Sequence, residues 1–296
     1  MPVSANTHDL QWRSSAAQRF FMSVTDGTKD PGLTKVRAES SDPQGWYIVG
    51  ADGTSYGWSN DHDPADAQRF MNRGLAGYRK HSPKPVEVTQ AEIDEPFAVS
   101  PDPTTSVVHV YSRIRPLPED VWGLNRGVGR DFLWVYAEEV DAMARAALSD
   151  EPFALPEALV RRIVRFHLVD DVRGTPDMWG PHEVHRQRFT AMRIGDAGAT
   201  IRIRFSGDFA MHNKKRGYVG AIDGELELDP AARKVTRFRA YAKGPAWGAG
   251  SQTPFPPPGR FTLHIAMVEG DEEITRVVPP EAVSTRGSDA GYRAPR

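Results

Sequence analysis

The chain has 296 residues, 39% of them hydrophobic, which is enough for about two domains with cores of their own. Its 37 basic and 39 acidic residues give a net charge of -2, so no overall field steers the molecule to nucleic acid or to an anionic membrane, and only local patches remain open to such partners. The absence of cysteine excludes disulfides, thiolate nucleophiles and cysteine metal sites.

The first 95 residues contain the pattern of a strand, a hairpin and a helix. Residues 19–24 form a short apolar run of strand length. Two aromatic-rich segments flank Asp52-Gly53, a dipeptide that tolerates the positive φ angles of a tight hairpin turn. Asp63-Pro64 then provides an N-cap and a first-turn proline, and apolar residues follow at helical spacing, which predicts a helix over 64–81. This order is that of the second half of a thioredoxin-like domain without its CxxC.

Residues 82–105 contain five prolines and are predicted to be a linker. A strand with His109 inside it is expected over 105–114, and a short apolar run over 131–136. Residues 137–148 are rich in alanine, and Glu138 and Glu139 complement the dipole of a helix in its first turn.

The central stretch 155–179 has two interpretations. Leu159, Val160, Ile163, Val164 and His167 recur as an apolar stripe, which predicts a helix through about 168. Alternation from residue 163 onward favours a strand instead. In a helix, residues 167 and 171 are ~6 Å apart along the axis and can touch; in a strand they are ~13 Å apart and cannot.

From residue 184 the hydrophobic period changes to two. Over residues 200–205, side chains are expected to point alternately to the two faces of a strand: Ile201, Ile203 and Phe205 inward, and the arginines between them outward. Further strands are expected over 218–228, interrupted at Asp223-Gly224, and over 234–242 and 261–268. Strands at this spacing predict an antiparallel meander that curls into a sandwich or partial barrel.

The predicted fold is therefore α+β. We expect a thioredoxin-like α/β unit over 1–95, a connector with a strand and a helix over 96–155, an antiparallel β domain over 156–280 and a disordered tail over 281–296. No signal-peptide pattern and no apolar run approaching the ~18 residues of a membrane span is present, so we expect a cytoplasmic protein.

Three phrases of the sequence carry a resemblance. RFHLVDDVRGTPDMW, GRDFLWVYAEE and RFRAYAKGPAWG are similar to phrases of uncharacterised bacterial proteins of planctomycete type, which join a thioredoxin-like N-terminal region to a C-terminal β domain. The resemblance implies an architecture, and it carries over no catalytic or binding residue.

His167, Asp171 and Arg173 are the candidate catalytic residues. If the helix continues, Asp171 can orient His167 and raise its pKa, the arrangement that a general base needs. The alternative is structural: a histidine at a helix C-terminus is favourable to the dipole, and the charged residues fix the following loop.

His182 and His185 are the candidate metal ligands. On a helical turn the two imidazoles share a face, and His167, His212 or Asp171 would have to provide a third ligand for a divalent ion. The alternative is a pair of surface histidines at the start of a strand, with no cofactor.

Trp179 and Trp247 are the candidate ligand-binding residues. Both are expected in loops beside glycine and proline, where they either line a cleft or plug the ends of the sheet.

The first hypothesis is a non-redox binding or scaffold protein, with a small molecule or a protein as partner, whose site lies at the junction between loop 170–179 and the loop around Trp247. The second is a metal-dependent or His/Asp general-base hydrolase. Nucleic acid is not expected, because it requires a broader basic face with exposed aromatic residues than the turn 213–216 provides.

Overall fold

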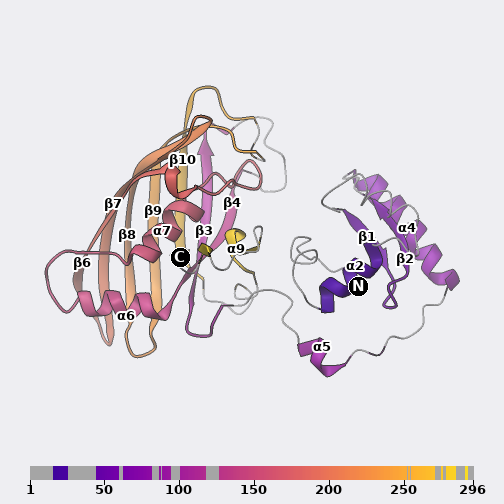
Figure 1. Ribbon diagram of the computed structural model, residues 1–296, viewed down its shortest axis with the longest axis horizontal. Coiled ribbons are helices and arrows are strands. Elements are labelled where there is room, and N and C mark those ends of the chain that lie inside the picture. The colour runs from indigo at the N-terminus through magenta and orange to yellow at the C-terminus, as the bar shows by residue number, and fades with distance from the viewer. Residues whose placement is uncertain are drawn as a thin grey trace. The chain divides into compact units, whose positions relative to one another are not determined.

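The structure is a computed structural model, and it describes residues 16–25, 45–59, 63–81, 87, 89–94, 101–117, 127–251, 253, 255–270, 275, 278–284 and 291–292. The chain divides into two compact units (Figure 1). Unit 1 comprises Met1–Ala98 with Ser284–Gly287, and unit 2 comprises Val99–Val283 with Ser288–Arg296.

Unit 1 is built around a hairpin with a helix packed on it. Its elements are α2 (Ala16–Thr25), β1 (Trp46–Val49), β2 (Ser55–Ser59), α4 (Pro64–His81) and α5 (Gln90–Asp94). β1 and β2 pair antiparallel, and the turn between them places Gly53 at a φ of 77°. A side chain on Gly74 of α4 would lie 2.3 Å from Ile48 of β1, so glycine is what lets the helix approach the hairpin. The predicted hairpin and the predicted helix over 64–81 are both confirmed.

The strand predicted over residues 19–24 is wrong, because these residues belong to helix α2. Val24 is buried whereas Phe20 is 44% exposed, the one-sided burial of an amphipathic helix. A short apolar run does not distinguish the two structures by itself. The described part of unit 1 therefore contains a two-stranded sheet, and a thioredoxin-like unit is not confirmed.

In the part of unit 2 that the structure describes, one antiparallel sheet of eight strands dominates, and it does not close. The strand order is β4-β3-β10-β9-β8-β7-β6-β5, so the last five long strands form a meander and the two earliest strands extend it beyond β10. The bounds are β3 (Ser106–Arg115), β4 (Gly129–Val135), β5 (Phe153–Ala154), β6 (Val184–Ala197), β7 (Thr200–His212), β8 (Arg216–Asp229), β9 (Lys234–Gly248) and β10 (Arg260–Glu269). The expected α+β class and antiparallel sheet are confirmed. The segment 96–155, expected to be a connector with a strand and a helix, contributes β3, β4 and β5 to this sheet.

Each long strand buries one face and exposes the other. Ile203 and Phe205 are buried while Arg204 between them is exposed, as the alternation predicts. The predicted interruption at Asp223-Gly224 is wrong, since β8 runs through it. A side chain on Gly224 would lie 2.5 Å from the ring of Phe205 on β7, so this glycine makes room for an aromatic neighbour and does not mark a turn.

The helices of unit 2 lie against the buried face of the sheet (Figure 1). α6 (Ala137–Ala146) contacts β9, and α7 (Glu157–Arg162) contacts β6. α7 continues as the π-helix η1 (Ile163–His167), and a 3-10 turn η2 (Pro181–Glu183) precedes β6. The helix predicted over 137–148 is confirmed.

The predicted disorder of residues 281–296 does not hold for the residues that the structure describes there. α9 (Glu281–Ser284) is helical, and Tyr292 is 1% exposed within the core of unit 2. In the described parts of the chain, no helix has the length and apolar character that a membrane crossing requires.

Candidate functional site

The central segment is helical up to His167. The backbone N–H of Leu168 donates to the carbonyl of Ile163 at 2.8 Å, the five-residue spacing of a π-helix. The strand alternative for residues 163–170 is therefore wrong. Single π-helical turns often occur at functional sites, since the wider turn changes the direction of the side chains that follow. Here it ends at His167, so Asp171 lies beyond the helix.

His167 is 1% exposed and both of its ring nitrogens have partners. Nδ1 lies 2.8 Å from a carboxylate oxygen of Asp131, which can only accept the hydrogen bond. Nε2 lies 2.7 Å from the hydroxyl of Tyr292, which also accepts a hydrogen bond from the backbone N–H of Trp134 at 3.2 Å. The carboxylate that orients His167 is therefore Asp131 and not Asp171.

Asp171 is close to other acids. Burial raises the pKa of its carboxyl to about 8, and the carboxylates of Asp131 and Glu281 add to the increase, while a hydrogen bond from the backbone of Arg130 opposes it. At neutral pH the folded protein therefore holds Asp171 mostly as the uncharged acid.

Arg173 joins two loops. Its guanidinium donates to Asp170 at 2.6 Å, to the carbonyl of Thr253 at 2.7 Å and to the carbonyl of Gly248 at 3.0 Å. The last two of these bonds connect loop 170–179 to the end of β9 and to the loop that follows it. Arg173 acts as a clamp between the two loops, and none of these three bonds goes to His167 or Asp171.

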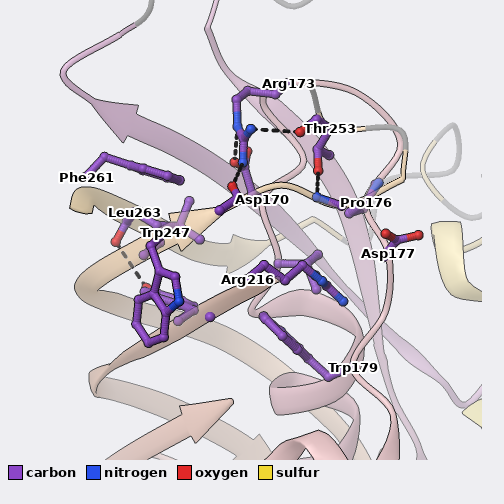
Figure 2. Close-up of a pocket in the computed structure, with 16 residues that line it drawn as sticks. Asp170, Arg173, Pro176, Asp177, Trp179, Arg216, Trp247, Thr253, Phe261 and Leu263 are labelled. Atoms are coloured by element: carbon purple, nitrogen blue, oxygen red, sulfur yellow. Dashed lines mark hydrogen bonds and ion pairs between the residues drawn. The ribbon is translucent and has the colours of Figure 1, made fainter. Parts of the chain in front are cut away.

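Trp179 and Trp247 both lie at this junction (Figure 2). Trp179 is 3% exposed, its indole N–H donates to the carbonyl of Leu168 at 2.9 Å, and the guanidinium of Arg216 lies 3.8 Å from its ring centroid. Trp247 is half-buried near the end of β9, and the guanidinium of Arg260 lies 4.7 Å from its ring.

The two loops enclose a small cavity, which we call the tryptophan pocket. Its walls include Asp170, Arg173, Trp179, Arg216, Trp247 and Phe261, and its volume is about 20 Å³. This is room for about one water molecule. All of its wall residues belong to unit 2, so the pocket lies within one unit.

His182 and His185 are not brought together as ligands. His182 is exposed on η2, whereas His185 is on β6, stacked on His212 with ring centroids 3.8 Å apart. The Nε2 of His185 lies 3.0 Å from the carbonyl of His212. Among the described residues no group of three His, Asp or Glu side chains is arranged to hold a metal ion.

The sequence reasoning missed several residues of these clusters, among them Asp131, Arg216 and Tyr292. Asp131 had a usable signal, since an acid between buried residues of a strand needs an internal partner. Tyr292 had none, because it lies in a polar segment with no periodicity. Comparison with family models, with curated proteins and with solved structures finds no match for this chain.

Proposed function

We propose that this protein is a non-catalytic binding protein whose site is the tryptophan pocket. The observation that carries the proposal is the junction of two loops about 70 residues apart in sequence, clamped by Arg173, with two tryptophans and Arg216 on the wall that they share. A concave site with aromatic walls and a few convergent polar groups is typical of small-molecule binding.

The chemistry of the wall favours a small planar ligand that carries a carboxylate. Arg216 covers the ring of the buried Trp179, so the half-buried ring of Trp247, beside Arg260, is the indole surface that a ligand can reach. A guanidinium pairs with a carboxylate in a planar geometry. Because the cavity holds about one water molecule, a larger ligand enters only if the half-buried ring of Trp247 moves. That ring lies on Gly217, where a side chain would be 2.2 Å from its Cζ2, and so no side chain at position 217 locks it.

Titration with benzoate and with indole-3-carboxylate, followed by tryptophan fluorescence and by ligand-observed NMR, tests the proposal. We expect saturable binding, and Arg216→Gln weakens it about tenfold because one charge-assisted hydrogen bond is lost. The matched control is Arg237→Gln on β9, an arginine that lies away from the pocket and pairs with Glu227 at 3.3 Å. Absence of saturable binding, or equal affinity in both variants, would contradict the proposal.

The second function, a His/Asp general-base hydrolase, has one observation in its favour, the hydrogen bond between His167 and Asp131. Against it, His167 is 1% exposed and both ring nitrogens are engaged. A general base must reach the proton that it removes. Metal analysis of the purified protein, with His182→Ala and His185→Ala as variants, tests the metal-dependent form.

We also propose, as the resemblance implies, that unit 1 descends from a thioredoxin-like domain that has lost its cysteines. The hairpin β1–β2 followed by α4 supports the proposal. Such a fold requires a further strand beside the hairpin. Backbone chemical shifts of residues 26–44 in the full chain provide the test, since a helical or random-coil signature throughout would exclude that strand.

A further inference from the structure

The exposed face of the sheet carries a surface of arginines and aromatic rings, on the side opposite Phe261 and Leu263 of the tryptophan pocket. Leu263 lines the pocket, while the next residue, His264, is on the other face of β10. We call this surface the cationic face. It comprises residues from four neighbouring strands: His109, Tyr111, Arg113 and Arg115 of β3, Arg130 of β4, Arg239, Tyr241 and Lys243 of β9, and His264 of β10.

The strand register places these side chains in rows. Across the sheet, Lys243, His264 and Arg113 are direct neighbours. The next row contains Tyr241 and Tyr111 with Ala266 between them, followed by Arg130 on β4. The short side chain of Ala266 lies between the two tyrosines. Tyr111 stacks on His109 with ring centroids 5.8 Å apart, and the hydroxyl of Tyr241 is hydrogen-bonded to Nδ1 of His264. Tyr241 is 47% exposed.

The positive charges of the cationic face are largely uncompensated. Among the described residues, Arg113, Arg115, Arg130 and Lys243 are exposed and form no ion pair, whereas Arg239 pairs with Glu269 at 3.9 Å. Burial lowers the pKa of His264, and Lys243, Arg115 and Arg113 lower it further, which is a consequence of the cations around it.

An acidic row on β8 limits the cationic face on one side. Asp223 and Glu225 lie beside Tyr241 and Arg239, and Glu225 pairs with Arg204 of β7 at 2.6 Å. A polyanion is therefore attracted to β10, β3 and β4 and repelled from β8. From the sequence, nucleic acid was not expected as a partner, because no segment provides a broad basic face with exposed aromatic residues. The fold assembles such a face from strands that are far apart in the chain.

We propose that the cationic face binds single-stranded nucleic acid. Arginine and lysine contact the phosphates, and Tyr111 and Tyr241 offer ring faces on which bases stack, the way in which exposed sheets with aromatic residues hold unpaired strands. Outward-facing residues recur every ~7 Å along a strand, which suits an extended strand laid over the sheet. An anionic membrane or an acidic protein would bind through the basic side chains alone and would not require contact with the tyrosine rings.

Fluorescence anisotropy of the full chain with labelled U12 and dT12 tests the proposal. We expect binding that weakens steeply with salt. The double variant Arg113→Gln/Arg130→Gln lowers affinity at least tenfold and reduces the magnitude of the salt slope by about 2. The matched control, Arg202→Gln/Arg204→Gln, removes the same charge from the exposed face of β7 and changes affinity less than twofold. Equal losses in the two double variants would overturn the proposal.

The rings are tested separately from the charges. Tyr111→Ala lowers affinity about tenfold and Tyr111→Phe restores it, because a base stacks on either ring. Vesicles containing phosphatidylserine, poly-glutamate and a 12-base-pair duplex are the competing probes. Displacement of U12 by any of these at equal charge concentration, or no binding of U12 and dT12 at 50 mM salt, would overturn the proposal.

Discussion

Tyr292 connects the C-terminal segment to the core through one hydroxyl group. That hydroxyl contacts Nε2 of His167 and the backbone N–H of Trp134, and all three groups are buried. Tyr292→Phe leaves both partners without their hydrogen bond, so we expect a loss of about 1–3 kcal/mol in the free energy of unfolding. Urea denaturation measures it. Tyr111→Phe on the exposed face is the control and changes stability by less than about 0.5 kcal/mol. No effect of Tyr292→Phe would mean that the segment is not docked.

Asp171 makes stability depend on pH. Its pKa is about 8 in the folded state and ~3.9 in the unfolded chain, so the folded state binds the extra proton between these values. Stability is therefore highest below about pH 4 as far as this group is concerned, and it falls as the pH rises towards 8. Asp171→Asn removes this dependence. Between pH 5 and 8.5, we expect the free energy of unfolding of the variant to rise relative to that of the wild type by an amount on the order of 2 kcal/mol. This figure is reduced to account for screening of the charge by solvent.

Urea denaturation at pH 5, 7 and 8.5 measures the difference. Asp170→Asn is the control, because its carboxylate pairs with Arg173 and its loss destabilises the protein at each pH. Parallel pH profiles for Asp171→Asn and the wild type would show that Asp171 titrates normally.

At the level of single residues, the sequence predicted which segment carries the polar cluster but not which side chains pair. Residues 167 and 171 are four apart, and the spacing argument assumed a regular α-helix through both. The π-helix ends at His167, and a residue 36 positions earlier supplies the carboxylate. Long-range pairs of this kind depend on strand register, which local spacing does not encode.

The packing of α7 on α6 includes a buried ion pair. Arg162 of α7 donates to Glu139 of α6, both are almost fully buried, and the guanidinium lies 4.6 Å from the ring centroid of Tyr136. Glu139→Gln leaves the arginine charge buried without a counter-charge, so we expect a loss of about 3–5 kcal/mol. The double variant Glu139→Gln/Arg162→Met removes both charges. The amide introduced at position 139 still accepts the hydrogen bond from the backbone N–H of Tyr136, which the carboxylate of the wild type accepts at 3.0 Å. The double variant should recover most of the loss, and a double loss equal to the sum of the single losses would contradict this account.

At the level of elements, the sequence predicted best where two independent signals agreed. The hairpin had alternating aromatic segments and an Asp-Gly turn, and the helix α4 had a cap, a proline and a helical stripe. Residues 19–24 had only apolar character, and Gly224 had only its poor strand propensity. In both cases a tertiary contact decided the structure, the buried side of α2 in one and the ring of Phe205 in the other.

At the level of the whole molecule, the net charge did not indicate how charge is distributed over the surface. A net charge of -2 hides a sheet face on which β8 gathers carboxylates and β3, β4 and β9 gather cations. The sequence separates these strands by up to about 130 residues, and only the order β4-β3-β10-β9-β8 brings them together. Net charge therefore does not determine the charge of a local surface patch.

Among the described residues, the hydrophobic core cluster lies in unit 2. It runs from Val107 to Tyr292 and takes none from residues 1–98, where Val24 and Phe70 are buried outside it. We therefore expect a chain without residues 1–98 to fold, with a melting temperature for unit 2 within a few degrees of the full chain.

A chain without residues 285–296 loses the buried ring of Tyr292, a cost of about 3–5 kcal/mol, and its melting temperature falls by roughly 10 °C. Circular dichroism on heating measures both. An unfolded first truncation would show that the sheet depends on unit 1, and an unchanged second truncation would show that the core is complete without the C-terminal segment.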